Sequence, residues 1–255
     1  MFKPELLKIL KKEPVMKSQE KKIKLTGTIL GMLFALITVI RLLTGGEVDR
    51  LLLAFGTVFL VMLPAAMEWV FHCRICLPVY IFGLLYAVGP MLGHCWYLYY
   101  TVSWWDKLLH ISGGVMFAIV GAFFFDRLVQ GKQKPFAGAL FALCFSIAIA
   151  AIWEFAEFGA DRFLGMDMQD DTVIHSLTSY LLGESVGVTG SIPNIQSVVI
   201  DGSALPVSGY IDIGLIDSML DMLLESLGAL ITSALLILDK GRHPLIQDKI
   251  VRSKS

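Results

Sequence analysis

The amino-acid sequence predicts an all-α fold, a polytopic membrane helix bundle of about six transmembrane helices. The 255 residues are 56% hydrophobic and only 17% charged, whereas a soluble domain carries about 25% charged residues. The mean hydropathy is +0.70. In addition, six segments reach the roughly 20 mostly apolar residues that a membrane-spanning helix needs.

The same composition excludes several classes of protein. An apolar excess of this size is unlike that of a soluble globular enzyme or of a disordered chain. The 21 basic residues are balanced by 22 acidic residues, which gives a formal net charge of −1. Because a nucleic-acid-binding surface needs a basic footprint, we expect no nucleic acid among the partners.

The expected spans are separated by short connections, with one exception. The first span follows a Lys-rich segment and is expected to stay in the membrane as an anchor, because no small-x-small cleavage site follows it. Pro64 is expected to bend the second span and Gly89-Pro90 to kink the third. The six expected spans are Leu25–Leu43, Leu51–Phe71, Leu77–Val102, Leu108–Leu128, Phe136–Phe158 and Leu215–Leu238.

The distribution of basic residues predicts the orientation of the bundle. With six spans, 17 of the 21 Lys and Arg residues fall on one side, and only Arg50, Lys107 and Arg162 fall on the other. Basic residues are enriched in cytoplasmic loops. We therefore expect a multi-pass protein of the cell membrane with both termini cytoplasmic, made of a tail (1–24), a transmembrane domain (25–240) and a second tail (241–255).

The exception is the connection between the fifth and sixth spans, residues 159–214, which is expected to be extracytoplasmic. Its first part, Asp161–Leu182, is expected to hold a short helix along the membrane surface. Its second part contains Ser197–Ser203, whose β-branched residues and Asp201-Gly202 pair predict a small hairpin or lid. Loops of this length are often functional or disordered.

Acidic residues gather at the outer ends of three expected spans. An i,i+4 spacing places Asp106 and His110 on one face of the fourth span. Acids also end the fifth span and begin the sixth, where they occupy successive helical turns. These acids are Glu154, Glu157, Asp161, Asp217, Asp221 and Glu225.

Such a cluster is costly unless something neutralises it. A single charge near the bilayer centre costs about 2.5–3.5 kcal/mol on insertion scales. Two like charges 5 Å apart repel by about 3 kcal/mol at an effective dielectric constant of 20. The carboxylates must therefore be protonated, paired with bases, or bound to a cation, and a divalent metal is the simplest partner.

We predict a divalent metal ion held by carboxylates and one imidazole, a ligand set that suits Mg²⁺, Mn²⁺, Ca²⁺ or Zn²⁺. The expected ligands are Asp106, His110, Glu157, Asp217 and Asp221. His110, Glu154 and Glu157 are the candidates for general acid or base. Lys107 and Arg162 are the candidates for binding phosphate. Simpler roles stay open for single members, because Asp106 suits an N-cap and Asp161 and Asp217 suit solvated loop edges.

Four motifs resemble those of the YjdF-type membrane proteins of bacteria and archaea. The motifs are Asp106-x-x-x-His110, Glu154-x-x-Glu157, Met168-Gln169 and the run from Gly214 to Met222 with its two aspartates. More loosely, they resemble VanZ-like proteins, a group linked to glycopeptide resistance and to families proposed to act on lipid head groups or lipid-linked cell-wall precursors. The resemblance adds Gln169 to the expected polar site. It also identifies 172–214 as an insertion, because many relatives place the Gln motif close before the last helix.

Three kinds of function are compatible with this pattern. We expect an enzyme of the cell envelope that uses the metal to act on a membrane lipid head group or a lipid-linked phosphate at the outer leaflet. A proton- or cation-coupled transporter is the second reading, since stacked acids can form a relay. A non-catalytic binding or assembly protein is the third. The sequence predicts no oligomeric state.

Two further motifs are interpreted as chance matches. Gly183-Glu-Ser-Val-Gly187 has the form of a nucleophile elbow, but that motif needs a strand before it and a helix after it in an α/β sheet. Cys73 and Cys76 supply half of a zinc site, and no second pair follows them in the sequence.

Overall fold

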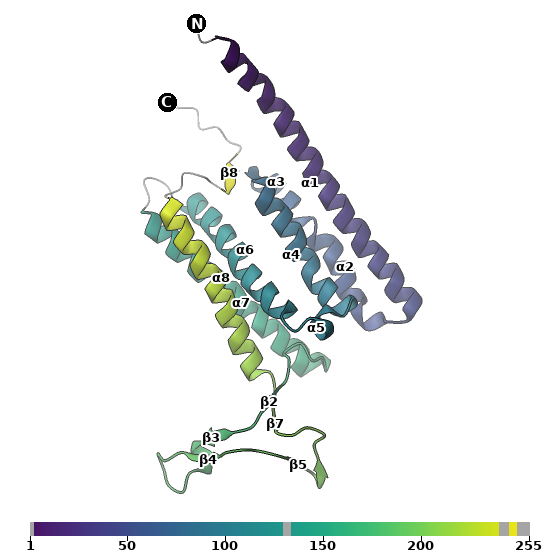
Figure 1. The fold of residues 1–255 in the computed structure, drawn as a ribbon, viewed down its shortest axis with the longest axis vertical. Coiled ribbons are helices and arrows are strands. Elements are labelled where there is room, and N and C mark those ends of the chain that lie inside the picture. Colours follow the sequence, from purple (N-terminus) through teal and green to yellow (C-terminus); the bar gives the residue numbers. More distant parts are fainter. Residues whose placement is uncertain (1–2, 130–133, 240–244, 249–255) are drawn as a thin grey trace.

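Helix α1 (Lys3–Gly45) opens a bundle whose long helices lie side by side (Figure 1). The computed structural model describes residues 3–129, 134–239 and 245–248. Within these residues, six helices are long and apolar enough to cross a membrane, which confirms the predicted fold class. Helix α1 already begins at Lys3, so residues 3–24, predicted as a tail, continue the first helix. Of the predicted second tail, 241–244 and 249–255 lie outside the described residues.

The second span is divided beside its proline, whereas the third continues as a helix through its proline. The second span divides into α2 (Leu51–Leu60) and α3 (Leu63–Val70), with Pro64 in the first turn of α3. Proline fits the first turn of a helix because it has no N–H to leave unsatisfied. The third span, α4 (Leu77–Cys95), contains Pro90 and ends earlier than predicted. The chain turns at Tyr97, whose φ is +62°, into the separate short helix α5 (Leu98–Thr101).

The last three spans form a closely packed group. They are α6 (Trp105–Leu128), α7 (Pro135–Leu164) and α8 (Leu215–Asp239). Helices α1, α2 and α4 form a second group, and α4 packs against α6 where the two groups meet. We call this junction the seam.

One end of the bundle carries the start of α1, the end of α8 and a two-stranded sheet (Figure 1). Here β1 (Cys73–Ile75) pairs antiparallel with β8 (Ile246–Asp248), which ties the C-terminal segment to the turn between α3 and α4. In the same region, the Lys24 amine lies 2.7 Å from Glu68 and 3.1 Å from Glu20. Lys24, predicted to lie in a solvated tail, is thus buried and paired. We call this end the terminus end.

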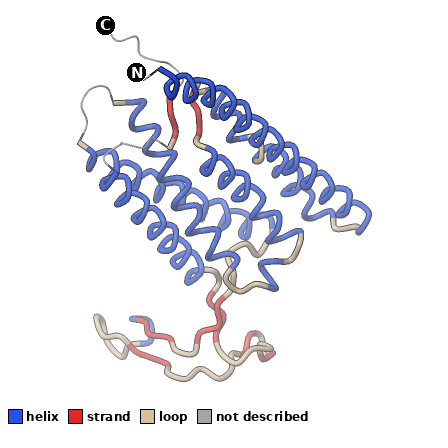
Figure 2. The backbone as a smooth tube through the Cα atoms, turned by 45° about the horizontal axis from the view of Figure 1, so that its top comes forward, coloured by secondary structure: helices blue, strands red, loops and turns tan. Residues whose placement is uncertain are grey.

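The connection from α7 to α8 projects from the opposite end as an arm (Figure 2). Its stalk pairs β2 (Thr172–Ile174) with β7 (Tyr210–Asp212). Beyond the stalk, β3 (Leu177–Ser179) pairs with β4 (Gly190–Ile192), and β5 (Val199–Ile200) pairs with β6 (Ser203–Ala204). The 3-10 turns are η1 (Val48–Arg50), which precedes α2, and η2 (Tyr180–Leu182) in the arm. We call the end that bears the arm the arm end.

The arm confirms one prediction and overturns another. Asp201 and Gly202 both have positive φ, 50° and 82°, as the two central residues of the predicted hairpin turn require. The surface helix predicted for Asp161–Leu182 is wrong, because α7 itself continues to Leu164 and short strands follow. Gly165, with φ of +65°, ends α7 in the left-handed conformation that glycine adopts freely.

Candidate functional site

The candidate site lies at the arm end, where α6 begins and α8 begins beside it. Asp106 and His110 are one turn apart on α6, and His110 is buried against α8. The Nε2 atom of His110 lies 3.5 Å from Oδ1 of Asp106 and 3.4 Å from Oδ2 of Asp221. One ligand atom from each of these three residues lies within 4.8 Å of the other two. We call Asp106, His110 and Asp221 the Asp–His–Asp group.

Glycines bring α6 and α8 close enough for this arrangement. A Cβ atom on Gly114 would lie 2.0 Å from the Glu225 carbonyl oxygen, and one on Gly228 would lie 2.3 Å from the Ile111 carbonyl oxygen. Neither position admits a side chain, so the two backbones are in direct contact. Small residues are the usual means by which membrane helices approach each other this closely.

Glu225 lies behind the imidazole, one turn deeper on α8. Its Oε2 atom is 4.0 Å from His110 Nδ1, on the side of the ring opposite the two aspartates. The side chain is almost fully enclosed, with 4% of Glu225 exposed. At this distance the contact is a pairing of charges and not a hydrogen bond.

Several carboxylate oxygens of this region have no protein partner. Among the described residues, both oxygens of Glu154 are buried without a hydrogen bond, as are Oδ2 of Asp106 and Oε1 of Glu225. Glu154 is only 6% exposed, and it interacts with the Ser218 hydroxyl and with the charges of His110 and Asp106. Buried polar groups in folded proteins nearly always have a partner. The unpaired oxygens therefore point to a ligand.

The start of the arm is anchored beside the group by backbone hydrogen bonds. Asp161 accepts from the Met168 N–H at 2.6 Å and from the Gln169 N–H at 2.9 Å, and the Gln169 amide donates to the Ser218 hydroxyl. Asp217 accepts from the Asp170 N–H at 2.9 Å. Desolvation, and then the nearby charge of Asp106, raise the pKa of the Asp170 carboxyl.

The predicted site residues fall into four sets. Asp106, His110 and Asp221 meet in one group. Glu154 and Glu157 are buried beside it, whereas Asp217 holds the arm through the Asp170 N–H. The predicted phosphate-binding side chains, Lys107 and Arg162, are exposed at the arm end.

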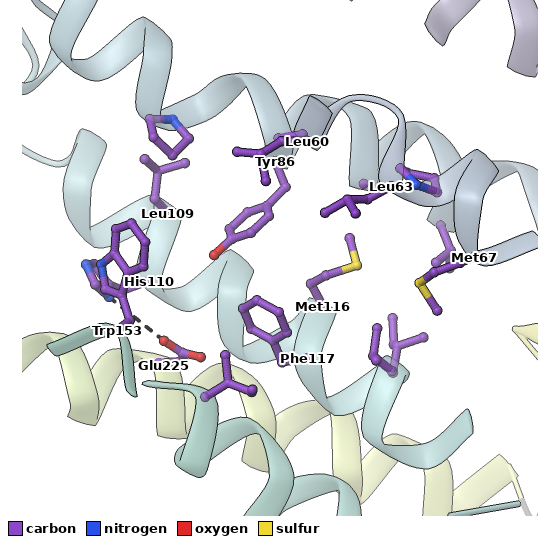
Figure 3. A pocket seen from close by; sticks show the side chains of 18 of the residues that line it. Leu60, Leu63, Met67, Tyr86, Leu109, His110, Met116, Phe117, Trp153 and Glu225 are labelled. Carbon is purple, nitrogen blue, oxygen red and sulfur yellow. Dashed lines mark ion pairs between the residues drawn. The ribbon is translucent and has the colours of Figure 1, made fainter. Parts of the chain in front are cut away.

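A cavity of about 320 Å³ extends from the Asp–His–Asp group along the seam (Figure 3). His110, Glu157 and Glu225 line one end of it together with two tyrosines. One of these, Tyr99, lies on α5 outside the membrane-spanning helices. Burial raises the pKa of its hydroxyl, and the charges of Asp106 and Glu157 raise that pKa further. Tyr99 is therefore a neutral hydrogen-bond donor at pH 7.

A family model described as "Predicted membrane protein (DUF2238)" matches residues 26–242, which is most of the chain. The chain belongs to the DUF2238 family. The region shared with DUF2238 contains the whole of α2 to α8, and with it the Asp–His–Asp group and the arm. No curated protein and no solved structure matches the chain significantly.

In this DUF2238 protein, two side chains beside the group carried no predicted role. Tyr86 extends from α4 toward α6, where a Cβ atom on Gly113 would lie 2.8 Å from the Tyr86 hydroxyl and 3.5 Å from the Glu225 carboxyl carbon. Glu225 was expected as one of the acids of the sixth span, but no binding or catalytic role was predicted for it. Its spacing of four residues from Asp221 is the signal that could have assigned it. No sequence signal assigns Tyr86, because α4 and α6 meet only through the fold.

Proposed function

We propose that this DUF2238 protein is a metal-dependent enzyme that acts on a lipid head group or a lipid-linked phosphate. The proposal rests on the Asp–His–Asp group, which presents two carboxylates and one imidazole nitrogen to a common point. Two ligands bound to one metal at about 2.1 Å, in tetrahedral geometry, lie about 3.4 Å apart. The observed separations from His110 Nε2, 3.4 and 3.5 Å, agree with that value.

The ligand chemistry narrows the metal to a few ions. Carboxylate oxygens with a single imidazole suit Mg²⁺, Mn²⁺, Ca²⁺ or Zn²⁺. A bound metal would offset the charges of the two aspartates, whose burial in a membrane-spanning segment is otherwise costly. Glu225 would hold the imidazole ring in place from its far side.

The surrounding side chains suit hydrolysis or transfer at a phosphate. A metal in this position would polarise a phosphoryl oxygen or activate a bound water. Glu154, buried and without a hydrogen-bond partner among the described residues, would accept a proton from the attacking group. Lys107 and Arg162 at the rim would bind phosphate oxygens through charge-assisted hydrogen bonds.

Two sequence features support the lipid substrate and its location. The motifs around the site resemble those of YjdF-type proteins and, more loosely, those of VanZ-like proteins. The VanZ-like proteins have been grouped with families proposed to act on lipid head groups or lipid-linked cell-wall precursors. In the sequence, 17 of the 21 basic residues belong to the segments expected on the side of the termini, so by the positive-inside rule that side would be cytoplasmic. The Asp–His–Asp group would then act at the outer leaflet.

The shape of the cavity argues against the alternative of a proton or cation relay. Its charged lining residues, His110, Glu157 and Glu225, all belong to the arm end, and apolar side chains line the rest. A relay needs polar groups along its whole length.

Metal content tests the proposal. The detergent-purified protein is analysed by elemental mass spectrometry beside a folded Asp106→Asn/His110→Gln double variant. The matched control is Asp201→Asn/His175→Gln, which makes the same two chemical changes in the exposed arm. We expect a near-stoichiometric divalent metal in the unmodified protein and the control, and its loss from the double variant. No metal in any of the three, even after divalent ions are supplied, would refute the metal-dependent mechanism.

A further inference from the structure

The cavity along the seam changes character along its length. Beyond the charged and tyrosine side chains at the arm end, its walls are hydrocarbon and thioether groups such as Met67, Val79, Met116 and Phe117 (Figure 3). A volume of about 320 Å³ falls at the lower end of the range for small-molecule sites. A cavity with one charged end and one long apolar end is complementary to an amphiphile, a molecule with a polar head and a hydrocarbon chain.

The length of the cavity matches one hydrocarbon chain. Its lining residues on α4 run from Val79 to Pro90, and those on α6 run from Leu109 to Val120. At 1.5 Å of rise per residue, each stretch is about 16 Å long. That is about half of the 30 Å hydrocarbon core, or the depth of the chains in one leaflet.

The cavity also borders the surface that faces the membrane. Three of its lining side chains are substantially exposed on the outside of the bundle, namely Leu60 at 38%, Leu63 at 53% and Trp153 at 44%. Leu60 ends α2 and Leu63 begins α3, whereas Trp153 lies on α7. An opening beside these exposed side chains would give membrane lipid a lateral route to the cavity.

We propose that the seam cavity holds one hydrocarbon chain of the lipid substrate, with the polar head group of that lipid at the Asp–His–Asp group. This inference rests on the proposed function and adds the binding mode and class of its substrate, a lipid with a chain inserted into the protein. A chain in the cavity restores van der Waals contacts that an empty apolar cavity lacks. It also places the head-group atoms beside His110 and Glu225 without burying the head group among apolar side chains.

Photo-crosslinking tests the inference in nanodiscs that contain the full chain. The two probes are dodecyl phosphate and farnesyl phosphate, each with a diazirine at the end of the chain. In the unmodified protein we expect labels on cavity-lining residues, such as Val79 and Tyr86 of α4 and Phe117 and Val120 of α6. Labelling by both probes or by one supports the inference, and the ratio of the two distinguishes a linear alkyl chain from a branched isoprenoid chain.

Two variants in the same region make the test specific. Met116→Trp fills the middle of the cavity and should reduce labelling of the cavity-lining residues at least tenfold. The control, Leu85→Trp, adds the same ring to the membrane-facing side of α4, where Leu85 is 67% exposed, and should leave labelling unchanged. Phe117→Ala enlarges the cavity and should retain labelling.

The outcomes separate this inference from the proposed function. Labels confined to membrane-facing residues in the unmodified protein would overturn the inference, as would equal labelling of folded Met116→Trp and Leu85→Trp. The mapping in the unmodified protein needs no variant, so it decides the matter even if Met116→Trp does not fold. Metal content is measured on the same samples. Chain labelling without bound metal would refute the metal-dependent function and support the chain site. Bound metal without chain labelling would support the metal-dependent function and refute the chain site.

Discussion

Replacing Gly114 by alanine should separate α6 from α8 and thereby weaken metal binding. The added Cβ would lie 2.0 Å from the Glu225 carbonyl oxygen and 2.8 Å from the Ala229 nitrogen, both of which are backbone atoms. Real Cβ contacts are essentially never shorter than 3.0 Å, so the helices must move apart by about 1 Å. Metal–ligand distances tolerate only about 0.2 Å.

The displacement acts directly on the site because Asp106 and His110 lie on α6 and Asp221 lies on α8. We expect the affinity for a divalent metal to fall by about 10- to 100-fold, the range seen when groups that orient a metal site are disturbed. Overpacking of this kind also costs about 1–3 kcal/mol of stability. Metal titration of the detergent-purified variant, followed by elemental mass spectrometry and thermal unfolding, measures both effects.

The matched control is Gly56→Ala, because a Cβ on Gly56 meets nothing within 4 Å. That substitution should leave metal affinity unchanged, and by helix propensity it should stabilise α2 by up to about 1 kcal/mol. If Gly114→Ala binds metal as tightly as the control does, the close approach of α6 and α8 does not set the geometry of the site, and the reasoning fails.

Two further substitutions separate the site from the rest of the bundle. Glu225→Gln should lower metal affinity about 10- to 100-fold by removing the carboxylate beside His110 Nδ1, and an unchanged affinity in a metal titration would show that Glu225 does not orient the ring. Glu68→Gln should cost about 2 kcal/mol in thermal unfolding, because it removes the nearer of the two carboxylates that pair with buried Lys24. Glu68→Gln should leave the metal content unchanged. A loss of metal in this variant would contradict the expectation that the terminus end does not influence the site at the arm end.

The spans could be predicted because length and apolar composition are local properties of the chain. The last span, predicted as Leu215–Leu238, forms the helix Leu215–Asp239. Local composition fails where a helix continues beyond its apolar part. Helix α7 runs six residues past the predicted end at Phe158, to Leu164, through a stretch that is helical but no longer apolar.

The strands were missed, apart from the hairpin, because their partners are distant in the sequence. The hairpin at Asp201-Gly202 is encoded by two adjacent residues that accept positive φ. The stalk pairs Thr172 with Asp212, and the sheet at the terminus end pairs Cys73 with Asp248. Three-residue strands carry too little pattern to indicate such a partner.

The candidate site was predicted in composition but not in detail. Topology alone brings the ends of three helices together, which is why Asp106, His110 and Asp221 could be named in advance. The rotation of each helix decides which acids converge, and the sequence does not encode it locally. Asp217 and Asp221 lie one turn apart on α8, yet Asp221 meets His110 and Asp217 binds the Asp170 N–H.

The stalk makes the arm an independent attachment. Because β2 and β7 pair antiparallel with Ile174 opposite Tyr210, the chain leaves the bundle and returns to it at neighbouring points, about 5 Å apart. The positions of the helices therefore do not depend on how many residues lie between Ile174 and Tyr210. The entropic cost of a longer loop grows only logarithmically with its length. The segment 175–209 can thus be lengthened, exchanged or removed while the Asp–His–Asp group in the bundle keeps its geometry.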